Sequence, residues 1–377
     1  MINLETDILI IGGGIAGCIA AISLANTHGV VLIDKLKEPN ERIGESLAPA
    51  AQRILKQLDL LEGMETSTIA NEHLYMKNMG MQSFWGSEKV HIVDHLRNPD
   101  GFVKSLNRKA FESYLRASAV KKGVQCIWPA KMQNSHYEGN YWHITTKSGA
   151  ENTPPKNYHI KAKFIIDATG RQAYFAKSLN VKRQSIDKLI ACWATMPNYL
   201  ENTMSTISAT ENGWWYTAVV PNNKRIMAFQ TDADLIDKNS MKELDFFIEL
   251  AKENKQMAQI LEKTKSELKF HGTVAANSTK LEEIVGQQWA TLGDAAISFD
   301  PLSSQGMYNA MASAMQLTTL ITEMNFIHSN NVEKEKQFQK KYTRQIDQIW
   351  NSYLQHKKLF YSAEMRWKES SFWKRRH

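Results

Sequence analysis

The stretch DILIIGGGIAG, residues 7–17, places Gly12, Gly14 and Gly17 directly after a run of β-forming apolar residues. This spacing lets a strand turn sharply into a helix, and it brings bare backbone N–H groups and the positive end of the helix dipole up to a pyrophosphate. A second strand, VVLID, ends in Asp34, close to the interval of roughly 20 residues at which such an acid meets a ribose hydroxyl. The pattern predicts a dinucleotide site, and the acid favours an adenosine without a 2′-phosphate.

The stretch WATLGDAAISFDPLSSQG, residues 289–306, indicates the other end of the same site. A short strand ends at Gly293 and Asp294, and a glycine-permissive turn precedes another helix. A further strand at FIIDATG, residues 164–170, fits the same plan. Because glycines in the first spacing also occur in ordinary strand-to-helix turns, the prediction depends on these segments together.

Five segments carry a resemblance to a known superfamily. They are the GGGxxG opening, IGESLAP at 43–49, LNRKAF at 106–111, IIDATGR at 165–171 and the GD…DPLSSQG run. In this order they resemble the p-hydroxybenzoate-hydroxylase-like flavoproteins, which include aromatic monooxygenases and flavin-dependent halogenases. The resemblance covers essentially the whole chain and implies that the dinucleotide is FAD.

A narrower resemblance is carried by segments outside the nucleotide contacts. They are FWGSEKV at 84–90, GWWYTAVVP at 213–221, TDAD at 231–234 and EMRWKESSFWKRR at 364–376. These resemble accessory flavoproteins that help form the tryptophan-derived quinones of glycine oxidase, lysine ε-oxidase and quinohemoprotein amine dehydrogenase. The resemblance implies that the substrate is a side chain of a partner protein, the precursor of a quinone-dependent oxidase. Composition alone does not show this.

The alternation of strands and helices predicts an α/β (α+β) fold with a discontinuous cofactor domain. We expect a Rossmann-type FAD domain with a parallel sheet from residues 1–76, 104–188 and 272–316. Period-two strands predict an inserted, mostly antiparallel substrate sheet from 77–103 and 189–271, with one helix near 241–254. Residues 317–377 should form a helical C-terminal region.

Composition places the chain among water-soluble globular proteins. Apolar residues make up 43% of the 377 residues, and no run approaches the 18 or more apolar residues of a membrane-spanning helix. The first strand begins within the first ten residues, which leaves no room for a signal peptide, so we expect the cytoplasm. A monomer is favoured. The three cysteines form no CxxC pattern and imply neither a disulfide frame nor a metal site.

The net charge of +7 is concentrated near the C-terminus. Phe338, Tyr342, Ile346, Trp350 and Leu354 follow one another at four-residue steps among many lysines, which predicts an amphipathic helix with a basic outer face. That face is either simply solvated or a docking surface for an acidic partner. No nucleic-acid-binding signature is present, so we expect no nucleic-acid partner.

Some of the predicted cofactor contacts follow from the sequence pattern, and others are implied by the family resemblance. The three glycines should hold the pyrophosphate, and Asp34 the adenosine ribose. By resemblance, Arg108 lies over the pyrophosphate or ribityl chain, and Asp294 accepts a hydrogen bond from a ribityl hydroxyl. N–H groups at the start of the helix after the DPLSSQG turn should stabilise charge near N1 and the C2 carbonyl of reduced flavin. The full predicted set is Gly12, Gly14, Gly17, Asp34, Lys35, Arg42, Glu45, Ser46, Arg108, Asp167, Gly170, Gly293, Asp294, Pro301, Ser304, Gln305, Gly306 and Met307.

An aromatic wall is the predicted substrate site, formed by Trp85, Trp214, Trp215 and Tyr216. Indole and phenol rings stack readily on an aromatic guest, although core packing explains any one of them equally well. Adjacent residues of a strand face opposite sides, so at most one of Trp214 and Trp215 can line a given cavity.

The favoured function is an FAD-dependent monooxygenase that uses O₂ to hydroxylate an aromatic ring, a tryptophan side chain of a partner protein. The flavin carries the chemistry while the protein positions and shields it. Glu45 and His73 are the candidate acid or base residues. No second GxGxxG is present, so the electrons come either from NAD(P)H bound transiently or from a separate flavin reductase.

Two alternatives stay open. Lys77 follows Gly44 at an interval that resembles the spacing to the catalytic lysine of tryptophan halogenases, which points to a halogenase of an indole or phenol. Against it, those enzymes carry a glutamate where this chain has Ser303. The other alternative is a non-catalytic flavoprotein that acts as a chaperone or subunit of a partner oxidase.

Overall fold

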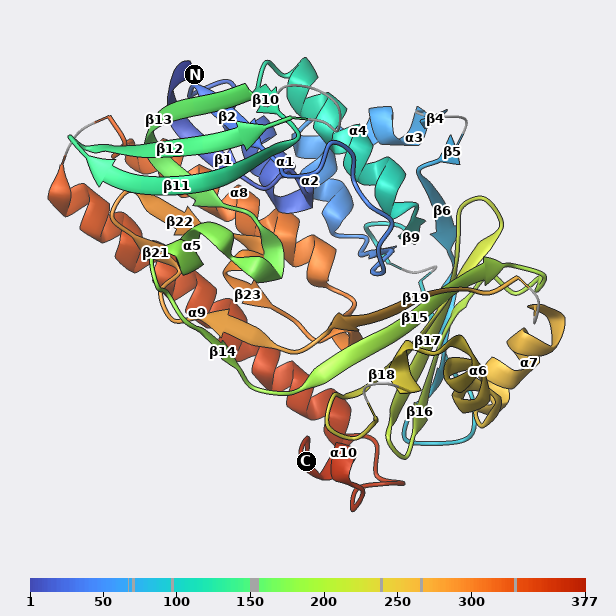
Figure 1. The fold of residues 1–377 in the computed structure, drawn as a ribbon. Helices are drawn as coiled ribbons and strands as arrows, with labels where there is room; N and C mark the ends of the chain where they lie inside the picture. Colours follow the sequence, from blue (N-terminus) through green and yellow to red (C-terminus); the bar gives the residue numbers. More distant parts are fainter. Residues whose placement is uncertain are drawn as a thin grey trace.

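The computed structural model describes residues 1–66, 68–69, 72–95, 98–149, 156–237, 240–264, 267–328 and 331–377 (Figure 1). Its architecture is the predicted mixture of a largely parallel sheet with helices, an antiparallel sheet and C-terminal helices. None of the helices in the described part of the chain combines the length and the apolar character needed to span a bilayer.

The larger sheet has a parallel centre. Four neighbouring pairs are parallel, β10–β2, β2–β1, β1–β13 and β13–β22, and antiparallel strands extend the sheet from β13 through β12 to β11 and from β22 to β21. Residues 8–11 are buried because layers cover both faces of the sheet at this point. The strands are β1 (Ile2–Ile11), β2 (Val30–Ile33), β10 (Gln125–Ile127), β11 (Ala130–Glu138), β12 (Tyr141–Ser148), β13 (Lys156–Asp167), β21 (Val285–Gly286) and β22 (Trp289–Thr291).

Three helices gather at this sheet: α1 (Ile15–Leu24) packs against both α4 (Arg108–Lys121) and α8 (Gly306–Met324). The close approach of α1 to β1 depends on missing side chains. A Cβ atom on Gly17 would lie 1.9 Å from the carbonyl oxygen of Gly12, and one on Gly12, whose φ is +113°, would lie 2.4 Å from the carbonyl oxygen of Ala168. Glycine is therefore required at both positions.

The second sheet has seven strands in the order β19-β15-β18-β17-β16-β7-β8, and every neighbouring pair except β16–β7 is antiparallel. Both predicted segments of the inserted sheet contribute strands to it, while the division into domains stays a proposal. The strands are β7 (Gly80–Phe84), β8 (His91–Asp94), β15 (Leu189–Pro197), β16 (Ser205–Thr210), β17 (Gly213–Val220), β18 (Lys224–Asp232) and β19 (Lys269–Ala275).

Two helices, not the single predicted one, cover one face of this sheet (Figure 1). They are α6 (Leu244–Lys252) and α7 (Lys255–Thr264). The helical pattern breaks at Asn254, whose side-chain oxygen accepts a hydrogen bond from the Met257 N–H, so this residue begins a second helix.

Short elements connect the two sheets. One three-stranded sheet joins β3 (Ser46–Leu47), β9 (Val103–Leu106) and β6 (Tyr75–Asn78), and another joins β14 (Arg183–Ser185), β20 (Thr279–Leu281) and β23 (Ile297–Ser298). The remaining elements are β4 (Thr68–Ile69), β5 (Glu72–His73), α2 (Ala51–Gln57), α3 (Leu61–Thr66) and α5 (Tyr174–Ser178).

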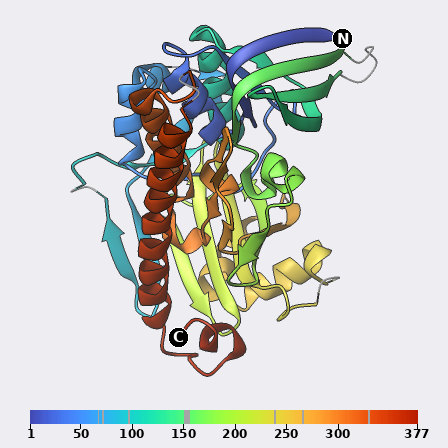
Figure 2. The same ribbon diagram turned by 90° about the vertical axis from the view of Figure 1, so that its left-hand side faces the viewer.

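The C-terminal region consists of the long helix α9 (Val332–Ser362) and the short α10 (Ser371–Lys374). Helix α9 runs along the molecule from the parallel sheet to the antiparallel sheet (Figures 1 and 2). Its predicted apolar stripe is confirmed for Phe338, Tyr342, Ile346 and Trp350. Further on, Tyr353 is buried and Leu354 only half-buried, because a turn of 3.6 residues drifts away from a strict four-residue step.

We expect Gly17→Ala to lower the free energy of unfolding of the apoprotein by about 1–3 kcal/mol, because the new methyl group overlaps the Gly12 carbonyl oxygen. Gly14→Ala is the matched control, since no atom lies within 4 Å of its Cβ position and its φ is −83°. Urea unfolding of both variants without added cofactor measures the difference. Equal stability of the two variants would contradict the packing role of Gly17.

Candidate functional site

A cavity of about 1320 Å³ lies where the two main sheets meet. Its walls come from the carboxyl ends of β1 and β2, the loop before β3, the turn before α8 and one face of the seven-stranded sheet. The predicted cofactor residues that line it are Gly12, Gly14, Asp34, Lys35, Arg42, Glu45, Ser46, Arg108, Gly170, Asp294, Pro301, Ser304, Gly306 and Met307. Gly17, Asp167, Gly293 and Gln305 are not among the lining residues.

The start of α1 is open to the cavity. Gly14, its N-cap residue, has no side-chain cap, and Ile15 and Ala16 line the cavity beside it. Backbone N–H groups in the first turn of a helix have no partner inside the helix, and they suit a phosphate. This end of the cavity therefore fits the predicted pyrophosphate.

Asp34 is held in place by a residue that the sequence analysis missed. Its carboxylate accepts hydrogen bonds of 2.7 Å from the N–H groups of Gly13 and Leu36, and it lies 3.0 Å from Nη2 of Arg116. Arg116, on α4, also donates to the carbonyl oxygens of Gly13 and Leu36. The arginine thus ties the glycine turn to the end of β2. No sequence pattern could indicate it, because the contact joins residues far apart in the chain.

Arg108 and Arg42 form a second cluster of arginine contacts along the cavity, centred on Glu112. The Arg108 guanidinium donates to the carboxylate of Glu112 at 2.6 Å and to the carbonyl oxygen of Gly44, while its buried Nε has no hydrogen-bond partner among the described residues. Arg42 lies 3.5 Å from the same Glu112. The two arginines give this wall the positive charge that an anionic cofactor requires.

Asp294 faces the cavity with 42% of its side chain exposed, and its Oδ2 atom lies 3.8 Å from Nε of Arg171. Burial raises the pKa of Asp294, while the positive charges of Arg171 and Arg183 oppose that rise. Arg171 also donates to the carbonyl oxygen of Phe299 at 3.0 Å, so it connects the end of β13 to the turn before α8. It belongs to the IIDATGR motif but was not predicted as a site residue.

The turn before α8 presents its backbone to the cavity. The Asp300 side chain caps a short 3₁₀ turn by accepting from the Leu302 N–H, and Ser304 adopts the left-handed conformation at φ +49°. Helix α8 then begins at Gly306 without a side-chain cap, and no atom lies within 4 Å of the Cβ position of this glycine. The first turn of α8 can therefore approach a flat ring closely, as the prediction of a flavin contact requires.

The opposite wall is aromatic. Trp193, on β15, stacks on His271, on β19, with ring centroids 3.9 Å apart and an interplanar angle of 8°. Both line the cavity, and neither was predicted. Burial lowers the pKa of His271, and its Nε2 atom lies 2.8 Å from Oγ1 of Thr195, so the neutral ring is favoured.

Trp214 and Tyr216 line the cavity, whereas Trp215 and Trp85 do not. Trp215 faces the other side of the sheet and packs on Phe229 and Phe247, as the alternation of a strand requires. Trp85 packs edge-on against Trp214 and donates its indole N–H to the carbonyl oxygen of Phe360. The substrate role of Trp85 and Trp215 is therefore withdrawn, since core packing explains both.

Of the three predicted catalytic residues, only Glu45 lines the cavity. It is 1% exposed. Burial of the Tyr216 phenol, and in addition the negative charge of Glu45, raise the pKa of Tyr216. Lys77 is exposed, with Nζ 5.7 Å from the centre of the Phe102 ring, and His73 is exposed on β5. Both lie outside the cavity. The sequence did not reveal this, because spacing along the chain does not determine which way the strands of this connecting region face.

The chain belongs to the FAD-binding domain family, whose model matches residues 5–325. It is a flavin-dependent oxidoreductase of the predicted superfamily. The cavity fits FAD, because two helix N-termini without side-chain caps open onto it and Arg42 and Arg108 are among its lining residues. A relative from Marinomonas mediterranea, LodB, is named as an FAD-dependent oxidoreductase. It is 26% identical over 377 residues, which cover 98% of this chain and 96% of LodB.

Other relatives are halogenases and a hydroxylase. Tryptophan 2-halogenase of Chondromyces crocatus is 23% identical over 82% of this chain and 60% of its own length. The structure of the flavin-dependent halogenase CmlS matches with a TM-score of 0.83 at 22% identity, over 99% of this chain and 68% of CmlS. The peptidyl tryptophan dihydroxylase QhpG, essential for tryptophylquinone cofactor biogenesis, matches with a TM-score of 0.78 at 19% identity, over 99% of this chain and 78% of QhpG. These structural matches establish the fold.

We expect Arg116→Met to weaken FAD binding about tenfold or more, because the glycine turn and Asp34 lose a buried, charge-assisted clamp. Titration of the apoprotein with FAD, followed by quenching of flavin fluorescence, measures the dissociation constant. Arg53→Met is the control, since the Arg53 side chain is 70% exposed and its ion pair with Asp100 lies at the surface. An unchanged dissociation constant for Arg116→Met would exclude the clamp.

Proposed function

We propose that this protein is an FAD-dependent monooxygenase that hydroxylates a tryptophan side chain of a partner protein during biogenesis of a tryptophylquinone cofactor. The observation that carries the proposal is a single cavity in which the predicted flavin contacts face an aromatic wall of Trp193, His271, Trp214 and Tyr216. The similarity to the peptidyl tryptophan dihydroxylase QhpG supports a protein substrate, and the similarity to LodB supports an FAD-dependent oxidoreductase.

The aromatic wall suits an indole guest. The Trp193–His271 stack offers a flat face, and the neutral histidine avoids placing a charge against an apolar ring. Tyr216 stands beside it, and its raised pKa keeps the proton on Oη. The protonated phenol faces the Glu45 carboxylate, and that carboxylate can receive a proton that the substrate ring releases.

When bound and reduced, FAD supplies the activation of O₂. One oxygen atom enters the aromatic ring, the other leaves as water, and two electrons come from NAD(P)H or from a separate flavin reductase. The apolar and aromatic residues that the second sheet contributes to the cavity limit the hydration of the substrate end. At the substrate end, Tyr216 keeps its phenolic proton and the Glu45 carboxylate receives the proton that the ring releases.

Halogenation is the second candidate, and the similarity to tryptophan 2-halogenase and CmlS favours it. The position of Lys77 argues against it, because the exposed ammonium lies outside the cavity that would hold the substrate. A non-catalytic role as chaperone or subunit would leave the aromatic wall without a purpose.

Co-expression with a candidate oxidase precursor, followed by mass spectrometry of its tryptic peptides, separates these functions. We expect added oxygen on tryptophan, no halogen when chloride or bromide is supplied, and full activity in Lys77→Met. Halogenated tryptophan that disappears in Lys77→Met would establish the halogenase instead. An unmodified precursor that matures only in the presence of the flavoprotein would support the chaperone.

The aromatic wall is tested by two matched variants. We expect Trp193→Phe to raise the KM for the partner about three- to tenfold, because a smaller ring stacks less well on the guest. Trp215→Phe, a buried tryptophan on the other face of the same sheet, should lower stability and leave KM unchanged. Steady-state kinetics and thermal unfolding of both proteins make the comparison. A similar rise in KM for both variants would argue against a substrate contact at Trp193.

A further inference from the structure

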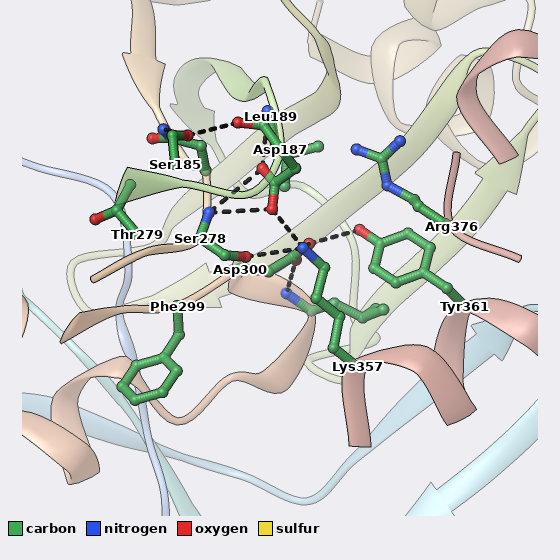
Figure 3. Close-up of polar contacts among 12 residues, drawn as sticks. Ser185, Asp187, Leu189, Ser278, Thr279, Phe299, Asp300, Lys357, Tyr361 and Arg376 are labelled. Carbon is green, nitrogen blue, oxygen red and sulfur yellow. Dashed lines mark hydrogen bonds and ion pairs between the residues drawn. The ribbon is translucent and has the colours of Figure 1, made fainter. Parts of the chain in front are cut away.

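The last turns of α9 reach the turn that precedes α8 through a buried polar network (Figure 3). Asp300, at the start of that turn, is 1% exposed. One of its carboxylate oxygens, Oδ1, accepts from the Leu302 N–H, and the other, Oδ2, accepts from the Tyr361 hydroxyl at 2.8 Å. The same Oδ2 atom lies 3.6 Å from Nζ of Lys357. Both oxygens of this buried carboxylate are thus occupied.

Lys357 stands between two carboxylates. Its ammonium group donates to Asp187 and, at 2.8 Å, to the hydroxyl of Ser278, in addition to facing Asp300 (Figure 3). Burial opposes ionisation of Asp187, but the charge and hydrogen bond of Lys357 hold its pKa below the usual value. Tyr353, one turn earlier on α9, accepts from the backbone N–H of Asp300 at 2.9 Å. Helix α9 therefore contacts both the side chain and the backbone of Asp300.

Tyr361 also connects this turn to the aromatic wall. Its hydroxyl accepts a hydrogen bond of 3.1 Å from the indole N–H of Trp214, a residue that lines the cavity. The bonds form a continuous path, from Trp214 Nε1–H to Tyr361 Oη and from Tyr361 Oη–H to Asp300 Oδ2. All three side chains are at most 2% exposed, so water does not compete for these groups.

The segment that supplies Lys357 and Tyr361 lies outside the residues that match the family model, which end at 325. Contacts with the seven-stranded sheet hold this segment in place. Trp373 is buried against the seven-stranded sheet, and Arg376 forms an ion pair with Asp232 on β18. The C-terminal segment is thus anchored to the seven-stranded sheet, and it also contacts the turn before α8.

We propose that Lys357 and Tyr361 are positioning residues of the flavin site, which hold Asp300 and its turn so that the N–H groups at the start of α8 face the flavin. Through Trp214 they also couple the aromatic wall to that turn. The inference rests on the proposed placement of the flavin ring against this turn, and it requires neither hydroxylation nor a partner protein.

The test compares two Tyr→Phe variants of one helix. Tyr361→Phe removes the hydroxyl that joins Trp214 to Asp300, whereas Tyr342→Phe removes a buried hydroxyl that donates at 2.7 Å to the Thr291 carbonyl oxygen. We expect Tyr361→Phe to weaken FAD binding about tenfold and to lower the midpoint potential, because misaligned N–H groups stabilise the reduced flavin less well. Tyr342→Phe should leave the dissociation constant and the potential unchanged.

A double-mutant cycle tests the coupling to the aromatic wall. Trp214→Phe removes the indole donor, and we expect its effect on the midpoint potential to be smaller in the Tyr361→Phe background than in the wild type. Additive effects would overturn the coupling, and equal changes in Tyr361→Phe and Tyr342→Phe would overturn the positioning role. Should Tyr361→Phe fail to fold, Lys357→Arg replaces it, because the larger planar guanidinium keeps the charge but cannot occupy the same position between the two carboxylates: weaker FAD binding than in Tyr342→Phe supports the proposal, and an unchanged dissociation constant overturns it.

These measurements use FAD and a redox dye in the absence of partner and oxygen. If the variants show the expected midpoint potentials but the wild-type protein leaves the partner unmodified, this inference stands and the proposed function is wrong. If the wild-type protein hydroxylates the partner but the midpoint potential of Tyr361→Phe is unchanged, the proposed function stands and this inference is wrong.

Discussion

The carbonyl oxygen of Gly12 lies where a side chain on Gly17 would have to be, and this contact sets the distance between α1 and the end of β1. Because α1 is so close, its open N-terminus lies at the carboxyl ends of the parallel strands β1 and β2. Arg116 then binds the glycine turn and Asp34 together. The nucleotide end of the cavity follows from these few contacts.

The other end of the cavity depends on how the second sheet meets the first. Its strands bring one aromatic face, with Trp193, Trp214 and Tyr216, opposite the turn before α8. Helices α6 and α7 seal the other face, where Trp215 is buried. Helix α9 spans both sheets, and its buried tyrosines reach the same turn. The flavin and substrate halves of the cavity are thus joined by the C-terminal helix as well as by the connecting strands.

Among the similar proteins, QhpG is a hydroxylase, whereas tryptophan 2-halogenase and CmlS are halogenases, so the choice between these reactions depends on the residues of this site. The cavity holds a carboxylate, Glu45, next to a phenol, Tyr216, whereas Lys77, the lysine that a halogenase would require, lies outside it. Lys77 lies on β6, which pairs with β9, and its side chain is exposed. Spacing along the chain does not reveal this pairing.

The sequence alone predicted a dinucleotide-binding α/β fold, because glycine spacing, apolar strands and the acid at Asp34 are local patterns that favour one geometry. The resemblance to the flavoprotein superfamily implied that the dinucleotide is FAD. The sequence also predicted the antiparallel insertion, the C-terminal amphipathic helix and the rule that Trp214 and Trp215 face opposite sides. Only the tertiary structure decided which of the two faces the cavity, and only it placed Arg116, Trp193, His271 and the Lys357–Tyr361 network. Those contacts join residues 57 to 170 positions apart, and side-chain partners at such distances depend on how sheets pack and helices cross rather than on any local pattern.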